Sequence, residues 1–176
     1  MKTSGLNLLF ALLMSLGAGL NALAQETPKG APSGDVFKDP AALLEQLPKE
    51  IAKDMRPGSR TLQEAIAKAN PILLPKVKDK PCEIEAIVSS VEKRFEPGST
   101  TVTGYFVSTQ YQKVRAAGAV FYCYYSLAFD KSASEKVAKM RRGEKIRAIG
   151  TCSGTEIMTG SQLPFFYIGI KDAKLK

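Results

Sequence analysis

Residues 119–127 of this 176-residue chain read AVFYCYYSL, and this stretch decides the kind of fold that the sequence predicts. Its aromatic and β-branched side chains favour an extended strand over a helix. Because successive side chains of a strand point to opposite faces, Phe121 and Tyr125 are expected to face a core, and Tyr122 and Tyr124 to face outward. The stretch is therefore predicted to be a strand with one face toward the core.

Four further segments have strand character, and their order along the chain suggests a fold. They are residues 81–91, 100–109, 145–152 and 163–170. The pattern of SASEKVAKM at 132–140 predicts a short helix between the third and fourth strands. A five-stranded barrel with one helix at that point is the OB architecture. The sequence thus predicts a mostly β OB-fold domain at residues 81–176, with 110–118 and 153–162 as connecting loops.

A short helical hairpin is predicted ahead of the barrel, at residues 39–72. Asp39-Pro40 has the residue types of a helix start, with a capping carboxylate followed by proline in the first turn. Asn70-Pro71 is expected to end the second helix, because proline disfavours a helical conformation at the preceding residue. We expect the apolar stripe of this hairpin to dock on the barrel. A dimerising or partner-binding surface is the alternative.

The first 24 residues have the pattern of a secretory signal peptide. Lys2 precedes an apolar run from Leu6 to Leu20, and Ala22-Leu23-Ala24 has the small residues of a cleavage site. An uncleaved membrane anchor is the alternative. Residues 25–38 are rich in Pro, Gly and polar side chains and are predicted to form a disordered leader. The expected location is therefore periplasmic or secreted.

The composition argues against an enzyme. The chain has no histidine, which is the commonest acid–base residue and metal ligand, and its three cysteines are scattered. We expect no catalytic residue, no metal and no cofactor. Carboxylates such as Glu83 and Glu85 are the remaining enzymatic alternative, although solvated charges are their default role. The formal net charge of +8 favours acidic partners and also aids solubility.

Residues 120–152 resemble the exported OB-fold domains of the tRNA-anticodon-like (tRNA_anti-like) group. The matching stretches are VFYCYYS at 120–126 and AKMRRGEKIRAIGTCSG at 138–154, within about the last 95 residues. The resemblance implies the OB fold. It implies no tRNA substrate, since the group's name records similarity of fold. Members often carry a further cysteine in the last strand, where this chain has Phe166 to Ile170.

Three cysteines in an exported protein predict one disulfide and one free thiol. In an OB barrel the start of strand one lies near the end of strand four, which predicts a Cys82–Cys152 bond. Cys123 would then be a small buried side chain. A Cys123–Cys152 bond and three reduced thiols are the alternatives.

A candidate ligand surface follows from the ligand-binding face of OB folds, which is formed by strands two and three and the flanking loops. Outward-facing tyrosines could stack on bases or sugars, and basic side chains could contact an anionic ligand. The predicted surface residues are Tyr105, Tyr122, Tyr124, Lys113, Arg115, Arg141, Arg142, Lys145 and Arg147. The alternative is that the tyrosines pack under the helical hairpin.

The function expected from the sequence is a non-enzymatic binding or interaction module of the bacterial cell envelope. Its partner would be a protein, a glycan or an anionic envelope component. An extracytoplasmic protein that binds single-stranded nucleic acid is the alternative.

Overall fold

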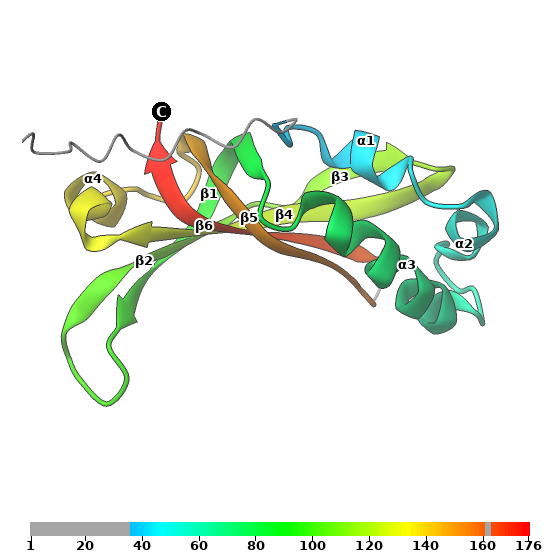
Figure 1. The fold of residues 1–176 in the computed structure, drawn as a ribbon, viewed down its shortest axis with the longest axis horizontal. Helices are drawn as coiled ribbons and strands as arrows, with labels where there is room; N and C mark the ends of the chain where they lie inside the picture. Colours follow the sequence, from blue (N-terminus) through cyan, green and yellow to red (C-terminus); the bar gives the residue numbers. More distant parts are fainter. Residues whose placement is uncertain (1–35, 161–162) are drawn as a thin grey trace, which may run out of the picture. The chain divides into compact units, whose positions relative to one another are not determined.

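The computed structural model describes residues 36–160 and 163–176. The predicted signal peptide at 1–24 and most of the predicted leader at 25–38 therefore lie outside the described residues. Within the described part, the chain is mostly β. Three helices precede the first strand, and a fourth comes between β4 (Ala119–Asp130) and β5 (Lys145–Met158) in the sequence (Figure 1).

Five strands close into a ring. Along the ring each strand is hydrogen-bonded to the next in the order β1-β2-β4-β6-β5, and β5 returns to β1. Their bounds are β1 Pro81–Phe95, β2 Val102–Thr109, β4 Ala119–Asp130, β5 Lys145–Met158 and β6 Phe165–Leu175. β4 and β6 are parallel, and the other pairs in the ring are antiparallel.

This connectivity is that of an OB barrel once β3 is counted as an insertion. The ring strands then run first, second, third, fifth, fourth. The one helical segment between the third and fourth ring strands consists of the 3-10 turn η1 (Lys131–Ala133) and α4 (Ser134–Ala138). The predicted fold class is therefore confirmed by the pairing of the strands.

Burial alternates at every position along β4, as the sequence of residues 119–127 predicts. Phe121, Cys123 and Leu127 have no exposed surface, whereas Tyr122 and Tyr124 are partly exposed on the other face. Cys123 is thus a buried side chain, as predicted. The inner side chains of β4 join those of β1, β5, β6 and the helices in one apolar core.

The prediction of a loop at residues 110–118 is wrong, because this segment contains a strand. β3 (Gln112–Ala116) forms a tight hairpin with β4, in which Ala116 is paired with Ala119. The two turn residues, Ala117 and Gly118, have positive φ angles of 50° and 77°. Such turns usually carry Asn or Gly at the first position, so alanine at 117 gave no turn signal.

The last two strands are longer than predicted, so the predicted loop at 153–162 begins only after Met158. Both strands pass through bulges, with register shifts between Ile149 and Thr151 and between Cys152 and Gly154. A bulge bends a strand and lets pairing continue. Gly154 therefore lies within a strand although its residue type suggests a loop.

From residue 36 onward, three helices and not two precede the barrel. They are α1 Pro40–Leu44, α2 Lys49–Asp54 and α3 Leu62–Val77. Asp39 caps α1 as predicted, since its carboxylate accepts a hydrogen bond from the Ala41 amide at 2.8 Å. The predicted stop at Asn70-Pro71 is wrong, because α3 continues through Pro71 and Pro75.

The packing of α3 explains why it tolerates two prolines. Pro71 and Pro75 lie on the exposed side of the helix, while Leu73 and Val77 are buried. The carbonyl groups that lose their helical partners to proline therefore lie on the exposed side, and the burial of the apolar side chains offsets the loss.

Asn70 fixes α3 against the edge of β5. Its amide nitrogen donates to the Ile157 carbonyl at 3.0 Å, and its amide oxygen accepts from the Ile157 N–H at 2.6 Å. The side chain thus replaces a neighbouring strand where β1 no longer reaches β5. As Figure 1 shows, α3 runs along this end of the sheet and α4 lies at the other end, beside β2.

None of the helices in the described ranges is both long and apolar enough to cross a membrane.

Candidate functional site

Five aromatic rings gather on the outer face of the sheet, and we call this group the aromatic platform. It consists of Tyr111, Tyr122, Tyr124, Phe165 and Tyr167. Tyr111 touches three of the others, with ring centroids 5.1–6.1 Å apart. These spacings are typical of aromatic pairs that stabilise one another. The platform is thus a cluster of rings, with Tyr111, at 60% exposure, as its most open member.

Strand pairing positions the platform. β4 and β6 are parallel neighbours in which Tyr122 is opposite Phe165 and Tyr124 is opposite Tyr167. Since paired residues share a face of the sheet, all four rings are outward while the residues between them fill the core. Tyr122 and Phe165 are stacked, with centroids 5.7 Å apart and an interplanar angle of 29°.

Two basic residues of β3 flank the platform. Lys113 is opposite Tyr122. Arg115 is two residues further along β3, on the same face, and is opposite Val120. The Lys113 ammonium lies 5.8 Å from the centroid of the Tyr122 ring, within the range of a cation–π contact. The structure therefore brings together four of the predicted surface residues: Tyr122, Tyr124, Lys113 and Arg115.

The charge around the platform is asymmetric. On the β5 side the exposed Glu156 is opposite Tyr167. Partial burial raises the pKa of the Tyr124 hydroxyl, and the nearby Tyr111, Tyr167 and Glu156 raise it further. Tyr124 is therefore neutral at physiological pH. An anionic chain crossing the platform would be favoured on the β3 side.

The outer face of β4 continues past the platform to β2. Phe106 on β2 is opposite Ala128 and is 39% exposed. The Arg94 guanidinium lies 6.0 Å from the centroid of its ring. Ala128 is six positions along β4 from Tyr122, which corresponds to about 20 Å of strand. This face of the second and third ring strands is the one that OB folds use for ligands.

Tyr105 does not belong to this surface, so that part of the prediction is wrong. It is opposite Phe129, which is fully buried, and it packs against the core. Its neighbour Phe106 has the outward position instead.

The other four predicted residues lie at the far end of β5. Arg141 and Arg142 are in the turn before the strand, and Lys145 and Arg147 are at its start. Phe165 of the platform is opposite Met158, the last residue of β5, so about 40 Å of strand separates Lys145 from the platform. The predicted surface is therefore two separate groups.

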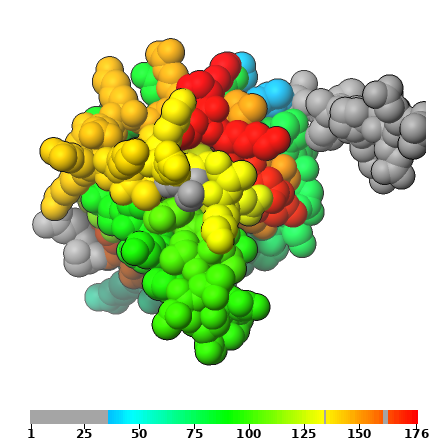
Figure 2. Space-filling model, turned by 90° about the vertical axis from the view of Figure 1, so that its left-hand side faces the viewer, coloured from blue at the N-terminus to red at the C-terminus, as the bar shows by residue number. Residues whose placement is uncertain are grey.

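We call the second group the basic end. Its exposed cations come from η1, α4, the segment that joins α4 to β5, and the start of β5: Lys131, Lys136, Lys139, Arg141, Arg142 and Lys145. Figure 2 shows these segments, in yellow to orange, as a continuous part of the surface above the loop between β1 and β2. Glu135 and Glu144 are exposed among them. Arg147 is paired with Glu85 at 2.7 Å.

Three platform residues were missed by sequence reasoning. Phe165 and Tyr167 alternate with Phe166 and Ile168, and this period of two was a usable signal once the parallel pairing of β4 with β6 is assumed. Tyr111 lies between β2 and β3, where no periodic pattern marks it.

The predicted Cys82–Cys152 disulfide is not formed in the structure, where all three cysteines are buried free thiols. The two strands are neighbours as expected, but Cys82 is opposite Gly150. Cys152 is thus two positions further along, and such diagonal pairs have Cα atoms about 7–8 Å apart, beyond the usual disulfide range. Cys123 is likewise unbonded.

The buried thiols predict a response to alkaline pH. Burial raises the pKa of Cys82 and of Cys123 from 9.0 to about 12. A thiol that ionises less readily in the folded state stabilises the fold below its unfolded pKa, and this contribution is lost as pH rises. We expect the free energy of unfolding to fall as pH rises from about 9 towards 12, as measured by urea titration.

Thiol counting provides the matching test. We expect no rapid reaction of the native protein with a thiol reagent at pH 8, and three reactive thiols after unfolding without reductant. A count of one after unfolding would instead demonstrate a disulfide and contradict the arrangement of cysteines described above.

In the described ranges, no three His, Cys, Asp or Glu side chains are grouped so that they could hold a metal ion. The chemistry that the site residues offer is stacking, cation–π contact and charge attraction.

The strand pairing thus defines an OB-fold protein that carries a cluster of aromatic rings on the outer side of its third and fifth ring strands. No family model matches the chain, and no curated protein matches it. Similar solved structures include the following two. Plasmodium falciparum SSB in complex with ssDNA has 13% identity and a TM-score of 0.34, covering 54% of this chain and 90% of that one. A proposed nucleic acid-binding lipoprotein from Klebsiella pneumoniae has 10% identity and a TM-score of 0.33, covering 74% of this chain and 99% of that one.

Proposed function

We propose that this chain is a non-enzymatic OB-fold binding module whose ligand lies across the outer face of β2, β4 and β6. The observation that supports this most directly is the aromatic platform, whose rings lie on the outer face of β4, the third ring strand, and of its neighbour β6. The outer face of β4 is shared with β2, and OB folds bind ligands on the face of these two strands. We also propose export to the periplasm or out of the cell, on the evidence of the N-terminal 24 residues.

Single-stranded nucleic acid is the ligand class that the geometry favours. Proteins that bind single strands combine rings on which bases stack with cations that follow the backbone. Lys113 and Arg115 lie along one side of the platform, and Arg94 lies over Phe106 at the other end of the face. A neutral glycan could use the rings, but it would gain little from these cations. A protein partner from the envelope is the second candidate, since an exposed aromatic cluster is also typical of protein interfaces.

A salt titration separates these candidates. We expect a fluorescently labelled oligothymidylate to bind with an affinity that falls linearly with salt on logarithmic axes, with a slope of about −0.7 for each phosphate contact. Replacing Lys113 and Arg115 together by glutamine is expected to reduce that slope by about one to two. Lys49 and Lys53 on α2, away from the face, provide a matched double replacement that is expected to leave the slope unchanged.

The absence of binding at low salt, or binding that does not depend on salt, would remove nucleic acid as the ligand. The glycan and protein candidates would then remain for the same face.

A further inference from the structure

A second candidate site lies on the other side of the sheet and shares no residue with the aromatic platform. It is a cavity of about 420 Å³ between α1, the end of α3 and the segment that precedes α1. Its volume is in the range of small-molecule sites, roughly 300–1,000 Å³. The lining residues that the following argument uses are Phe37, Leu43, Val77, Gln46, Lys76 and Lys80.

The walls of the cavity are held by main-chain hydrogen bonds. The Phe37 amide donates to the Pro81 carbonyl at 2.9 Å, and the Phe37 carbonyl accepts from the Glu83 amide at 3.0 Å. This residue therefore extends the sheet beside β1. The opposite wall is the turn after α3, in which the Lys80 amide donates to the Val77 carbonyl at 3.0 Å. The cavity is thus formed by ordered parts of the fold.

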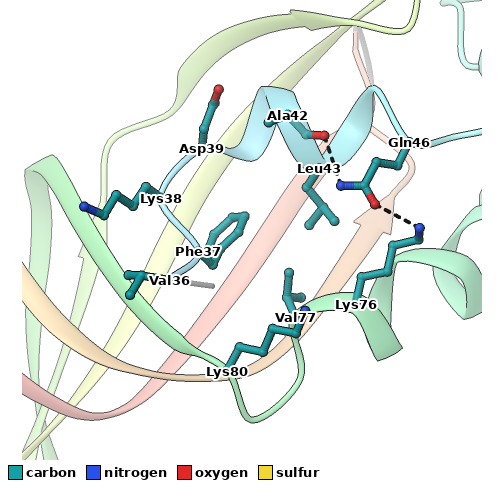
Figure 3. A pocket seen from close by; sticks show the side chains of 10 residues that line it. All are labelled: Val36, Phe37, Lys38, Asp39, Ala42, Leu43, Gln46, Lys76, Val77 and Lys80. Atoms are coloured by element: carbon teal, nitrogen blue, oxygen red, sulfur yellow. Dashed lines mark hydrogen bonds between the residues drawn. The ribbon is translucent and has the colours of Figure 1, made fainter. Parts of the chain in front are cut away.

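The floor of the cavity is apolar. Phe37, Leu43 and Val77 come from three different segments, and their side chains point toward one another in Figure 3. Each is at most 9% exposed. They are therefore a closed floor, and the exposed Val36 and Ala42 add apolar surface at its edge. An aliphatic chain lying over this surface would be removed from water, which is favourable in proportion to the apolar area covered.

The mouth of the cavity is cationic. The Lys76 ammonium donates to the neutral Gln46 amide oxygen at 2.8 Å, and the Lys80 side chain extends toward Val77 (Figure 3). Neither lysine forms an ion pair with any residue in 36–160 or 163–176.

The other two charged residues of the lining are already engaged. Lys38 points away from the floor and pairs with Glu83 at 3.5 Å, and the Asp39 carboxylate accepts the amide of Ala41. The cavity therefore combines an apolar floor with two available cations.

We propose that this cavity binds an amphiphilic anion, with an aliphatic tail on the apolar floor and a carboxylate or phosphate head at Lys76 and Lys80. A free fatty acid and the acyl chain of an anionic lipid have this chemistry in common. The proposal does not depend on nucleic-acid binding at the aromatic platform, because the two sites have no residue in common.

Calorimetric titration of the purified chain with decanoate, below its micelle concentration, tests the proposal. We expect saturable binding, with affinity rising about fourfold for each methylene from octanoate to decanoate while the tail fits. Decanol has the same tail without the charge and is expected to bind at least tenfold more weakly. Equal affinity for decanol and decanoate would overturn the role of the two lysines.

Variants locate the binding. Replacing Lys76 and Lys80 by glutamine is expected to weaken decanoate at least tenfold, and replacing Lys49 and Lys53 on α2 in the same way should have no effect. Ala42→Trp places a large ring in the cavity from an exposed helix position, and it should abolish binding at an unchanged thermal midpoint. Decanoate affinity that is the same in all these variants would overturn the proposal.

Vesicles distinguish the two sources of the ligand. Cosedimentation with phosphatidylglycerol vesicles that is lost in Ala42→Trp would identify an anionic lipid. Binding of monomeric decanoate without such cosedimentation would identify a free fatty acid.

Discussion

Replacing Tyr122 by alanine is expected to weaken binding of an oligothymidylate by about 1–3 kcal/mol, or roughly 5-fold to 150-fold. Tyr122 is stacked with Phe165 at 5.7 Å and lies 5.8 Å from the Lys113 ammonium. It therefore joins the aromatic and the cationic parts of the proposed ligand face. Fluorescence anisotropy at low salt measures the effect.

Two control variants isolate the contribution of the ring. Tyr122→Phe retains the ring and removes only the hydroxyl, so it should retain most of the affinity. Ile149→Ala removes an exposed apolar side chain from β5, which is not part of the proposed face, and should leave binding unchanged. If Tyr122→Ala binds as tightly as these controls while its thermal midpoint is normal, bases do not stack on the platform.

The fold could be predicted from the sequence because its main signal is local. Alternation along β4 fixes which side chains are inward without knowledge of any partner strand. The number and order of strand segments then select the OB connectivity. β3 was missed because Ala117 occupies a left-handed turn position where alanine is uncommon.

The site could be predicted only in part, because it depends on register between distant strands. In β2 both faces carry an aromatic residue, Tyr105 on one and Phe106 on the other, so alternation alone does not decide which is outward. The cysteine pairing failed for a related reason. The neighbouring strands were correct, but the register differs by two positions and places Gly150, not Cys152, opposite Cys82.

The prediction of a single basic surface was wrong because the sequence does not show at which end of the sheet each cation lies. Lys113 and Lys145 are both on strands of the same sheet, yet they flank opposite ends of it. Composition gives the number of cations and not their positions. The observed length of β5 shows that the cations beside the platform and those of the basic end are separate groups.

Closure of the barrel is the feature with the largest expected effect on stability, and it depends on Gly104. This residue of β2 is opposite Arg94 on β1 and Asp130 on β4, where the ring of strands closes. A Cβ at this position would lie 2.2 Å from the Phe129 carbonyl oxygen, which is a main-chain atom and cannot move as a flexible side chain can. Gly104→Ala is therefore expected to reduce the free energy of unfolding by about 3 kcal/mol, the upper end of the usual cost of overpacking.

Gly154→Ala is the matched control for this prediction. Gly154 is also a strand glycine beside a bulge, but the nearest atom to its Cβ position is a Leu74 methyl at 3.6 Å, an ordinary contact. We expect it to change stability by less than about 0.5 kcal/mol. In urea titrations, the two variants should differ in midpoint at a similar slope. Equal midpoints would mean that β2 and β4 do not meet at this register, and the outward face that they form together, including Phe106, would have to be redrawn.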